Sequence, residues 1–505
     1  MRLPTRRSLT AVAGTVALVV VAAACSSDDP SETGDAGGGD LAVAGPIPIE
    51  NLDPHGAASM DGGTQLAARA IFSQLVTSVG EGEFEGELAT EWTSNEDASE
   101  WTFTLREGVE YSDGTPVTAQ DVVASFERVL AGEGPLAGNF GGYTVAAPDE
   151  TTVVFTSPTP DAAFLGKISS FFVTPQSATD EAFFLDPVGS GPFVVESFEP
   201  GQSLQLAPNP GYWDGEPELE SLEFQSIPEV AARMTALQTG EVDVTWSMPD
   251  DQIGQLKSDS NLTVESVPSP GVMTMWMNSS VPALQDPAVR RALWQAVDFE
   301  SIITSLYPET GTPADSVVSP AVLGYAPQEP VQYDAEAAKA ALDAAGFDYE
   351  NTTIRFQFSQ PNFRQFVQAV VSDLAEIGVT AEPLEKEQAI FLEDLLAMNW
   401  DLNLQQIGSQ GYDAATNLGR LYPCAAGRTG YCNDELDQLL AAAGSSTDTA
   451  EREDLYAQAT EIIWNDAVGM YPMFVEQPYA WRNSVEGLEL ASDGLPDFAK
   501  VTVSE

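Results

Sequence analysis

The chain has 505 residues, which is too long for one ordinary hydrophobic core, so we expect two or three domains. Hydrophobic residues make up 43% of it and aromatic residues 9%, which excludes a disordered or low-complexity protein. The 77 Asp and Glu residues against 20 Lys and Arg give a formal net charge of −57. Such a field repels phosphate backbones and anionic lipid surfaces, so we expect no nucleic-acid partner and a highly soluble surface.

The N-terminus has the layout of an export signal. Three arginines within the first seven residues precede an apolar run, Ala11 to Ala24, which is short for a membrane span and predicts a signal peptide over residues 1–24. Small residues directly before Cys25 resemble a lipobox, so we expect Cys25 to be lipidated; an incidental cysteine in a secreted protein is the alternative. Residues 25–40 are polar and Gly-rich and predict a flexible tether. The paired arginines leave the export route open between the general and twin-arginine pathways.

Strand and helix patterns alternate along the rest of the chain. Alternating apolar and polar residues predict strands at 101–105, 151–156 and 219–224. Capping residues and 3.6-residue periodicity predict helices at 118–130, from 286–287 onward, at 334–345 and at 363–377. This alternation predicts layered α/β lobes. Arg290 lies in the helix that begins at Asp286, and we expect it to form an ion pair with a neighbouring element.

The cysteines of the body indicate an oxidising compartment. Cys424 and Cys432 are its only thiols, and in such a compartment a local disulfide between them is the expected arrangement. Two cysteines without a nearby histidine make an incomplete zinc set, so no metal site is predicted.

Signatures of catalysis are missing from the sequence. The single histidine, His55, can supply neither a His-containing triad nor a zinc site with two imidazoles. Gly189-Ser190-Gly191 lacks the spacing of a nucleophile elbow, and Gly166-Lys167 is not followed by Ser or Thr as in a phosphate-binding loop. Carboxylates are so abundant that chance proximity explains any glycosidase-like pair. We therefore expect a binding protein without enzymatic activity or cofactor.

A series of short blocks resembles one protein family over nearly the whole mature chain. The blocks include Leu88–Trp92, Trp101–Gly108, Tyr111–Val122, Val188–Phe193, Asn209–Trp213, Ala236–Asp243, Val289–Ala292 and Asn433–Asp437. In this order they resemble the peptide/nickel-type solute-binding proteins of ABC importers. No single block is decisive, but their collinearity over some four hundred residues is specific.

The resemblance implies an architecture and a way of working. The expected fold is α/β, a two-lobed periplasmic-binding-protein type II-like fold with an extra inserted domain. Lobe I would comprise residues 41–76, 188–271 and 481–505; the inserted domain 77–187; and lobe II 272–480. The ligand would lie between lobes that close by a hinge motion, because closure buries the ligand and strengthens its polar contacts.

Aromatic and sulfur-containing side chains are the first candidate ligand contacts. The segment that begins at Val272 is expected to cross between the lobes, with Met275 and Trp276 on opposite strand faces, so that one of them faces the cleft. Trp246 follows a strand-like run, where an aromatic ring can stack on a ligand. Core packing is the alternative interpretation for these residues.

Charged and amide side chains supply the remaining candidates. The resemblance to dipeptide-binding members makes Arg364 a candidate carboxylate clamp, with an exposed salt bridge as the alternative. In peptide-binding members an aspartate pairs with the α-ammonium of the peptide, and Gln410 occupies the matching position here, followed by Asp413. Either Asp413 takes over that role, or the ligand lacks a free amino terminus, as an oligosaccharide does.

The sequence therefore predicts a lipid-anchored, extracytoplasmic monomer that captures dipeptides or oligopeptides and delivers them to a membrane permease of an ABC importer. Contact with the membrane is expected only through the lipid. An oligosaccharide-binding member of the same family is the nearest alternative. A secreted hydrolase and a peptide-sensing receptor are alternatives from other classes.

Overall fold

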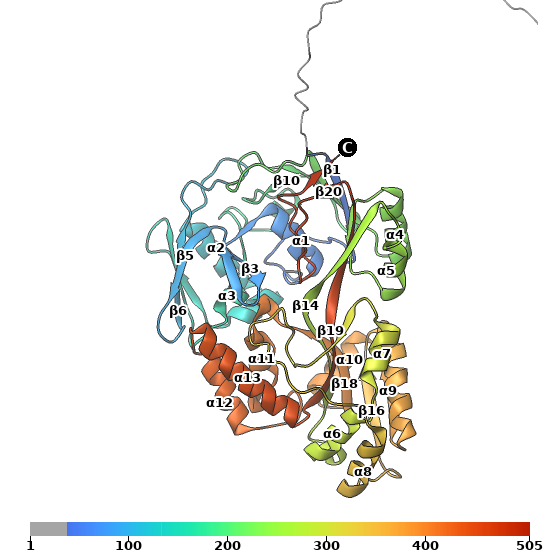
Figure 1. The fold of residues 1–505 in the computed structure, drawn as a ribbon. Helices are drawn as coiled ribbons and strands as arrows, with labels where there is room; N and C mark the ends of the chain where they lie inside the picture. The colour runs from blue at the N-terminus through green and yellow to red at the C-terminus, as the bar shows by residue number, and fades with distance from the viewer. Residues whose placement is uncertain (1–37, 133, 505) are drawn as a thin grey trace, which may run out of the picture. The chain divides into compact units, whose positions relative to one another are not determined.

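A computed structural model describes residues 38–132 and 134–504 (Figure 1). The predicted signal peptide and Cys25 lie outside the described residues, as does the tether up to residue 37. Gly38 and Asp40, which the sequence assigned to the tether, belong to the folded body. The Gly38 amide donates to the Glu218 carbonyl at 2.8 Å, and Asp40 begins the first strand in register with Ser221.

One sheet of eleven strands runs through both lobes. Its strands, in spatial order, are β10 (Phe193–Glu199), β11 (Ser203–Pro208), β12 (Ser221–Ser226), β1 (Asp40–Gly45), β13 (Val244–Trp246), β19 (Gly469–Arg482), β14 (Leu262–Met277), β18 (Leu402–Gly408), β16 (Thr353–Phe358) and β17 (Thr380–Glu385), and β15 (Gly311–Pro313) pairs with β19. The first five strands belong to lobe I and the last three to lobe II. Among the described strands, only β14 and β19 are long enough to take part in both halves.

β14 and β19 cross between the lobes as an antiparallel pair. Residues 262–268 of β14 pair with residues 476–482 of β19 at the lobe I end of the sheet, and residues 272–276 pair with residues 469–474 at the lobe II end. β19 therefore enters the lobe I part of the sheet near residue 476, a few residues before the expected boundary at 480–481. The register shifts between Pro268 and Val272, where Pro268 and Pro270 cannot donate to the ladder. The crossing therefore lies at 269–271, just before the segment expected from the sequence. From Gly271 onward, β14 also pairs with β18 of lobe II.

Lobe II packs its helices around the second half of the sheet. They are α6 (Pro287–Gln295), α7 (Phe299–Leu306), α8 (Ala335–Ala345), α9 (Arg364–Glu376), α10 (Gln388–Leu396), α11 (Leu418–Leu421), α12 (Asp434–Ala443) and α13 (Thr449–Asn465), with short 3₁₀ turns η3 (Pro282–Leu284), η4 (Pro361–Phe363), η5 (Gln410–Tyr412), η6 (Ala414–Thr416) and η7 (Cys424–Ala426). The predicted helix ends are confirmed at α8, where Asp334 caps the first turn and Gly346 ends the helix at φ 72°. One continuous core extends from Val272 to Phe474.

Lobe I is built from distant segments of the chain. α1 (Gly62–Ile71), α4 (Val230–Thr239) and α5 (Asp250–Leu256) pack on its part of the sheet, and the C-terminal segment adds β20 (Val485–Glu486) and β21 (Thr502–Val503). The core contains Leu41, Leu222, Tyr479 and Val501, so the two ends of the described chain share one hydrophobic cluster.

The inserted domain has its own four-stranded sheet, in the order β5 (Ala89–Ser94), β6 (Glu100–Leu105), β8 (Thr152–Thr156) and β7 (Thr144–Ala146). The remaining elements are β3 (Val76–Gly80), β4 (Glu83–Gly86), α2 (Ala119–Ala131), η1 (Pro135–Phe140), α3 (Phe164–Ile168), β9 (Phe172–Val173) and η2 (Phe183–Leu185). β2 (Ser73–Gln74), at the end of the first lobe I segment, pairs with β9. Trp101, Phe103 and Leu105 of β6 are buried, as their alternation predicts. Thr118 and Asp121 form a capping box at the start of α2.

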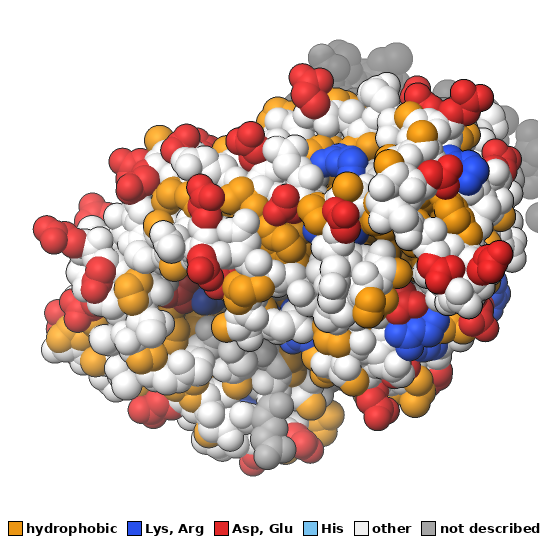
Figure 2. Space-filling view, turned by 90° about the horizontal axis from the view of Figure 1, so that it is seen from below, with side chains coloured by type: hydrophobic (Ala, Val, Ile, Leu, Met, Phe, Trp, Pro, Cys, Tyr) orange, Lys and Arg blue, Asp and Glu red, His pale blue; other side chains and the backbone are white. Residues whose placement is uncertain are grey.

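Two local features complete the fold. Cys424 and Cys432 form a disulfide with their Cα atoms 4.7 Å apart, as the sequence predicts. Acidic side chains are spread over the face shown in Figure 2, whereas Lys and Arg gather in a few places on it. Among the described residues, no helix is both long enough and apolar enough to cross a membrane.

Candidate ligand-binding site

Parallel strands of both lobes end beside the crossing strands. β1 runs parallel to β12 and β13 in lobe I, and β16 runs parallel to β17 and β18 in lobe II. In α/β sheets, ligands bind outside the carboxyl ends of such strands. The Ser247 amide, directly after β13, donates to Pro478 of β19 at 3.0 Å, and the Ser409 amide, directly after β18, donates to Pro270 of β14 at 3.2 Å. The carboxyl ends of the parallel strands in both lobes therefore adjoin the crossing. We call the region between these two sets of strand ends the seam.

Direct contacts join lobe II to the inserted domain at the seam. The Gln410 side-chain amide donates to Ser170 Oγ at 3.1 Å, and its Oε1 accepts from Asn139 Nδ2 at 3.4 Å. Next to it, the backbones of Gly166 and Gly411 approach so closely that a Cβ atom on Gly411 would overlap Gly166. Glycine at position 411 is thus required by this contact and by its φ of 62°.

The hairpin formed by β3 and β4 makes a second contact across the seam. At its tip, the Glu81 amide donates to the Ala321 carbonyl of lobe II at 3.0 Å. A Cβ atom on Gly82 would lie 2.7 Å from Leu323, so the tip packs directly on that side chain. The inserted domain and lobe II are therefore in contact along the seam.

A small pocket of about 110 Å³ lies at the lobe I edge of the seam. Trp246, at the end of β13, lines it together with Ile47, Gln477 and residues 493–495. The indole is 3% exposed, and its ring centroid lies 6.3 Å from that of Tyr479. Trp246 thus occupies the predicted strand-end position, and its contact with a ligand stays a prediction.

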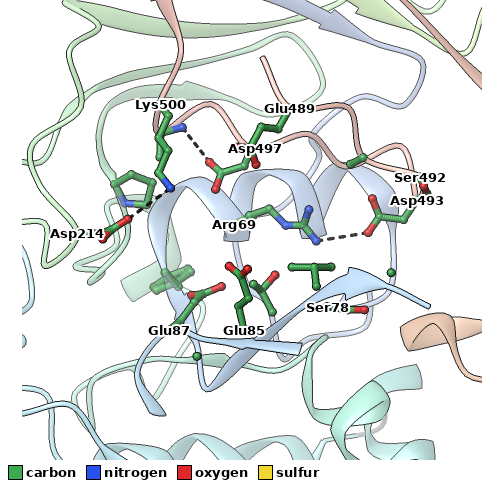
Figure 3. A pocket seen from close by; sticks show the side chains of 18 of the residues that line it. Arg69, Ser78, Glu85, Glu87, Asp214, Glu489, Ser492, Asp493, Asp497 and Lys500 are labelled. Atoms are coloured by element: carbon green, nitrogen blue, oxygen red, sulfur yellow. Dashed lines mark hydrogen bonds and ion pairs between the residues drawn. The ribbon is translucent and has the colours of Figure 1, made fainter. Parts of the chain in front are cut away.

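A larger cavity of about 500 Å³ adjoins the small pocket, and we call it the charged chamber (Figure 3). Its walls come from α1, from the β3–β4 hairpin and residues 85–87, from Arg106, from residues 212–214 and from residues 489–500. Tyr412, in η5, is the one contribution from lobe II among the described residues. Asp493 lines both cavities.

Charges of both signs face the charged chamber. Arg69 forms an ion pair with Asp493 at 3.4 Å and donates to the Leu495 carbonyl. Lys500 lies 3.8 Å from Asp214; Figure 3 marks both pairs with dashed lines. The remaining carboxylates, those of Glu85, Glu87, Glu489 and Asp497, have no cation within 4 Å in residues 38–132 and 134–504.

Glu87 is a carboxyl group of the chamber whose pKa differs clearly from its ordinary value. Burial raises its pKa to about 7, and nearby Asp497 adds to the increase. A hydrogen bond from the Gln74 amide at 2.8 Å and the charge of Arg69 act in the opposite direction but do not cancel it. Near neutral pH this carboxyl group is therefore divided between its protonated and ionised forms.

Comparison with known proteins connects this geometry to a family. Residues 83–428 match the model of the bacterial extracellular solute-binding proteins, family 5. The chain belongs to this family. It is 30% identical over 474 residues to the probable D,D-dipeptide-binding periplasmic protein DdpA of Escherichia coli K12, covering 87% of this chain and 89% of the relative. It is 27% identical over 484 residues to the dipeptide-binding protein of the same organism, covering 86% and 89%.

A solved structure agrees with the fold. HbpA2 from Haemophilus parasuis superposes with a TM-score of 0.85 at 25% identity, over 92% of this chain and all of that chain. The resemblance to the peptide/nickel-type solute-binding family and the type II-like α/β fold are therefore confirmed. The family is one of extracellular solute-binding proteins.

Three other residues that the sequence predicts to contact a ligand differ in how deeply they are buried in lobe II. Met275 and Trp276 are buried in its core, at 0% and 1% exposure, and the Trp276 indole donates to the Tyr422 hydroxyl at 3.1 Å. Arg364 is exposed and pairs with Glu385 at 2.5 and 2.6 Å. These positions match the packing and salt-bridge alternatives, and a ligand contact by any of the three stays a prediction.

Asp413, three residues after Gln410, is paired with a buried arginine. Its carboxylate accepts from Arg452 at 2.8 and 2.9 Å, and it also accepts from the Ala415 amide at the start of η6. Arg452 additionally donates to the Ala443 carbonyl and to the Tyr456 hydroxyl. In this arrangement Asp413 neutralises a buried guanidinium.

Sequence reasoning missed the residues of the charged chamber. Arg69, Arg106 and Lys500 are three of only 20 Lys and Arg residues in the chain, yet they converge on one cavity. On so acidic a chain, the scarcity of Lys and Arg is the signal that could have drawn attention to these three residues.

The first prediction concerns Asp413. Asp413→Asn leaves the Arg452 guanidinium buried without a counter-charge, so we expect a loss of about 3–5 kcal/mol in the free energy of unfolding. Urea unfolding without ligand measures it, and Glu385→Gln, which breaks the exposed pair with Arg364, should change the midpoint little. A well-folded Asp413→Asn protein with native stability would contradict the structural role.

The second prediction concerns Glu87. The folded protein holds this proton up to about pH 7, but an unfolded chain holds it only to its ordinary pKa of 4.5, so its contribution to stability falls as pH rises between these values. Glu87→Gln removes that loss, so the melting temperature of the variant relative to wild type should be higher at pH 8 than at pH 5. Exposed Glu91→Gln controls for the lost charge. A difference independent of pH would refute the assignment.

Proposed function

We propose that this protein is the substrate-binding component of an ABC importer, and that it captures short peptides between lobe I and lobe II and passes them to a membrane permease. The observation that carries the proposal is that the carboxyl ends of parallel strands from both lobes meet at the seam, which only β14 and β19 bridge among the described strands. We propose the three-part division into lobe I, inserted domain and lobe II on the same basis, and a monomer as the working unit.

Peptides are favoured as ligands by the names of relatives and by the chemistry of the seam. The two Escherichia coli relatives are named for dipeptide binding. A short peptide carries both an ammonium and a carboxylate group, and the charged chamber offers side chains of both signs. Bound peptide leaves chemically unchanged in this proposal, and no cofactor takes part.

An oligosaccharide is the second candidate ligand, and Gln410 is the observation that favours it. Its neutral amide lies at the seam, where it contacts Ser170 and Asn139, and neutral amides suit the hydroxyl groups of sugars. A peptide would forgo a charge-assisted hydrogen bond at this position.

Ligand panels separate these two candidates. Because a ligand that binds only the folded form raises the melting temperature, we expect dipeptides and tripeptides to stabilise the protein in differential scanning fluorimetry and oligosaccharides to have no effect. Stabilisation by sugars and by no peptide would overturn the peptide assignment. Recovering the peptides intact after prolonged incubation tests the absence of hydrolysis.

We also propose that Cys25 carries a lipid that holds the protein at the outer face of the cell membrane. The support is the run of small residues before Cys25 and the polar segment after it. We expect Cys25→Ser to move the protein from the membrane fraction to the soluble fraction, and intact-mass analysis of the wild type to show an acylated N-terminus. A Cys25→Ser protein that stays in the membrane fraction would refute the anchor.

A further inference from the structure

We infer that the small pocket at the lobe I edge of the seam receives one uncharged aliphatic side chain of the bound peptide, no larger than that of Leu or Met. This inference rests on the proposed peptide-binding function and deepens it, because it names a substrate class: short peptides that carry such a side chain at one position. Trp246 and Ile47 are the residues that set the size limit.

The small pocket lies where two neighbouring parallel strands of lobe I end. β1 pairs with β13 in parallel, with Val43 opposite Val244. Ile47 follows two residues after the end of β1, and Trp246 is the last residue of β13. Ligands of α/β sheets bind outside such carboxyl ends. Gln477 of the crossing strand β19 also lines the pocket, so the pocket adjoins the link between the lobes.

Aliphatic and aromatic side chains form most of the pocket wall. Ile47, Leu66, Trp246 and Leu495 all line it. Leu66 and Trp246 are buried, at 4% and 3% exposure, whereas Ile47 is 47% exposed and presents uncovered aliphatic surface. Removing such surface from water favours an occupant that is itself aliphatic.

The polar side chains of the small pocket already have partners within the protein. Gln477 Nε2 donates to Ser247 Oγ at 3.0 Å, and Asp493 forms an ion pair with Arg69 at 3.4 Å. A charged side chain that entered the pocket would lose its hydration, and a cation would have to compete with Arg69 for the one carboxylate. A carboxylate would in addition be repelled by Asp493. The pocket therefore selects against charge of either sign.

The floor of the small pocket is held in place, which gives it a size limit. A Cβ atom on Gly45 would lie 2.8 Å from the Trp246 ring, and the Tyr479 ring packs nearby at a centroid distance of 6.3 Å. Ser247 is in the left-handed region at φ 55°, and its amide donates to the Pro478 carbonyl at 3.0 Å. Non-glycine residues with such φ values are uncommon and cluster at ligand sites.

The volume of the small pocket indicates where this limit falls. It measures about 110 Å³. A protein cavity that takes up benzene has a volume of about 150 Å³, so an aromatic ring exceeds the space present here. A branched or unbranched aliphatic side chain is narrower and fits. Phe and Trp side chains would require the wall to move.

A dipeptide library with free termini tests the inference. It consists of two series, X-Ala and Ala-X, in which X is Gly, Val, Leu, Met, Phe, Trp, Lys or Glu. Isothermal titration calorimetry measures each member with the full mature chain. In the series whose X side chain occupies the pocket, we expect about tenfold tighter binding of the Leu and Met members than of the Gly member, and about tenfold weaker binding of Trp than of Leu. The Lys and Glu members should bind no more tightly than the Gly member.

Two variants test whether this pocket sets the preference. Ile47→Ala removes a half-exposed side chain and enlarges the pocket, so it should bring the affinities for the Leu and Trp members to within about threefold of each other. Gln477→Glu places a carboxylate in the wall and should weaken binding of the Leu member while leaving that of the Gly member unchanged. Ile390→Ala is the matched control, because it removes the same atoms from a side chain of 49% exposure on α10, and it should keep the wild-type order.

The outcomes separate this inference from the proposed function. If wild type binds the Gly, Leu and Trp members equally in both series, the inference is overturned while peptide binding stands. The same conclusion follows if Ile47→Ala and Gln477→Glu both keep the wild-type order of affinities. If no member of the library binds, the proposed function falls together with the inference.

Discussion

The architecture depends on two strands that belong to both lobes. β14 and β19 are paired along most of their length, yet the ladder is interrupted at residues 269–271, where Pro268 and Pro270 cannot donate a hydrogen bond. Lobe II is otherwise one uninterrupted core from Val272 to Phe474, and lobe I has its own cores. A link made only of extended backbone can bend while both cores stay intact. The contacts at the seam combine hydrogen bonds, such as those of Gln410 with Ser170 and of Glu81 with Ala321, with the close packing of Gly82 on Leu323.

Some of the few cationic side chains are buried in lobe II, and others line the charged chamber. Arg452 and Arg290 are buried and fully engaged in lobe II, the first by Asp413 and the second by the carbonyl oxygens of Leu284, Gln285, Asp466 and Ala467. In the charged chamber, by contrast, Arg69 and Lys500 each pair with a carboxylate, whereas Arg106 forms no ion pair within residues 38–132 and 134–504. A charged side chain without a partner at a cavity wall lowers the free energy of unfolding relative to a well-packed apolar side chain. Binding sites typically contain such destabilising groups.

Local pattern was enough to predict much of the fold. Capping residues and apolar periodicity located α8 and α9 to within one or two residues, because Asp334 and Gly346 act on their own turns and the 363–377 stripe faces one core. The family blocks gave the two-lobed fold. The ion pair expected for Arg290 was wrong because the unpaired carbonyls after the end of α13 fold back onto α6, a relation between segments about 175 residues apart that no local pattern encodes.

The site was harder to predict for the same reason. A single strand pattern cannot distinguish a cleft-facing side chain from a core one, and Trp276 and Met275 proved to be in the core of lobe II. Asp413 resembled a free carboxylate until its distant partner Arg452 was in place. Arg69, Arg106 and Lys500 come from three parts of the chain, and only the packing of α1, the inserted domain and the C-terminal segment brings them together.

The central claim is that the two lobes close on a ligand about the 269–271 crossing. Spin labels at cysteines replacing the exposed residues Glu127 of the inserted domain and Gln438 of lobe II report this motion directly through double electron–electron resonance. The account predicts a broad or longer distance distribution without ligand, and a narrower, shorter one when the dipeptide library with free termini is added. A distribution that stays the same while bound peptide is detected in the same sample would contradict it.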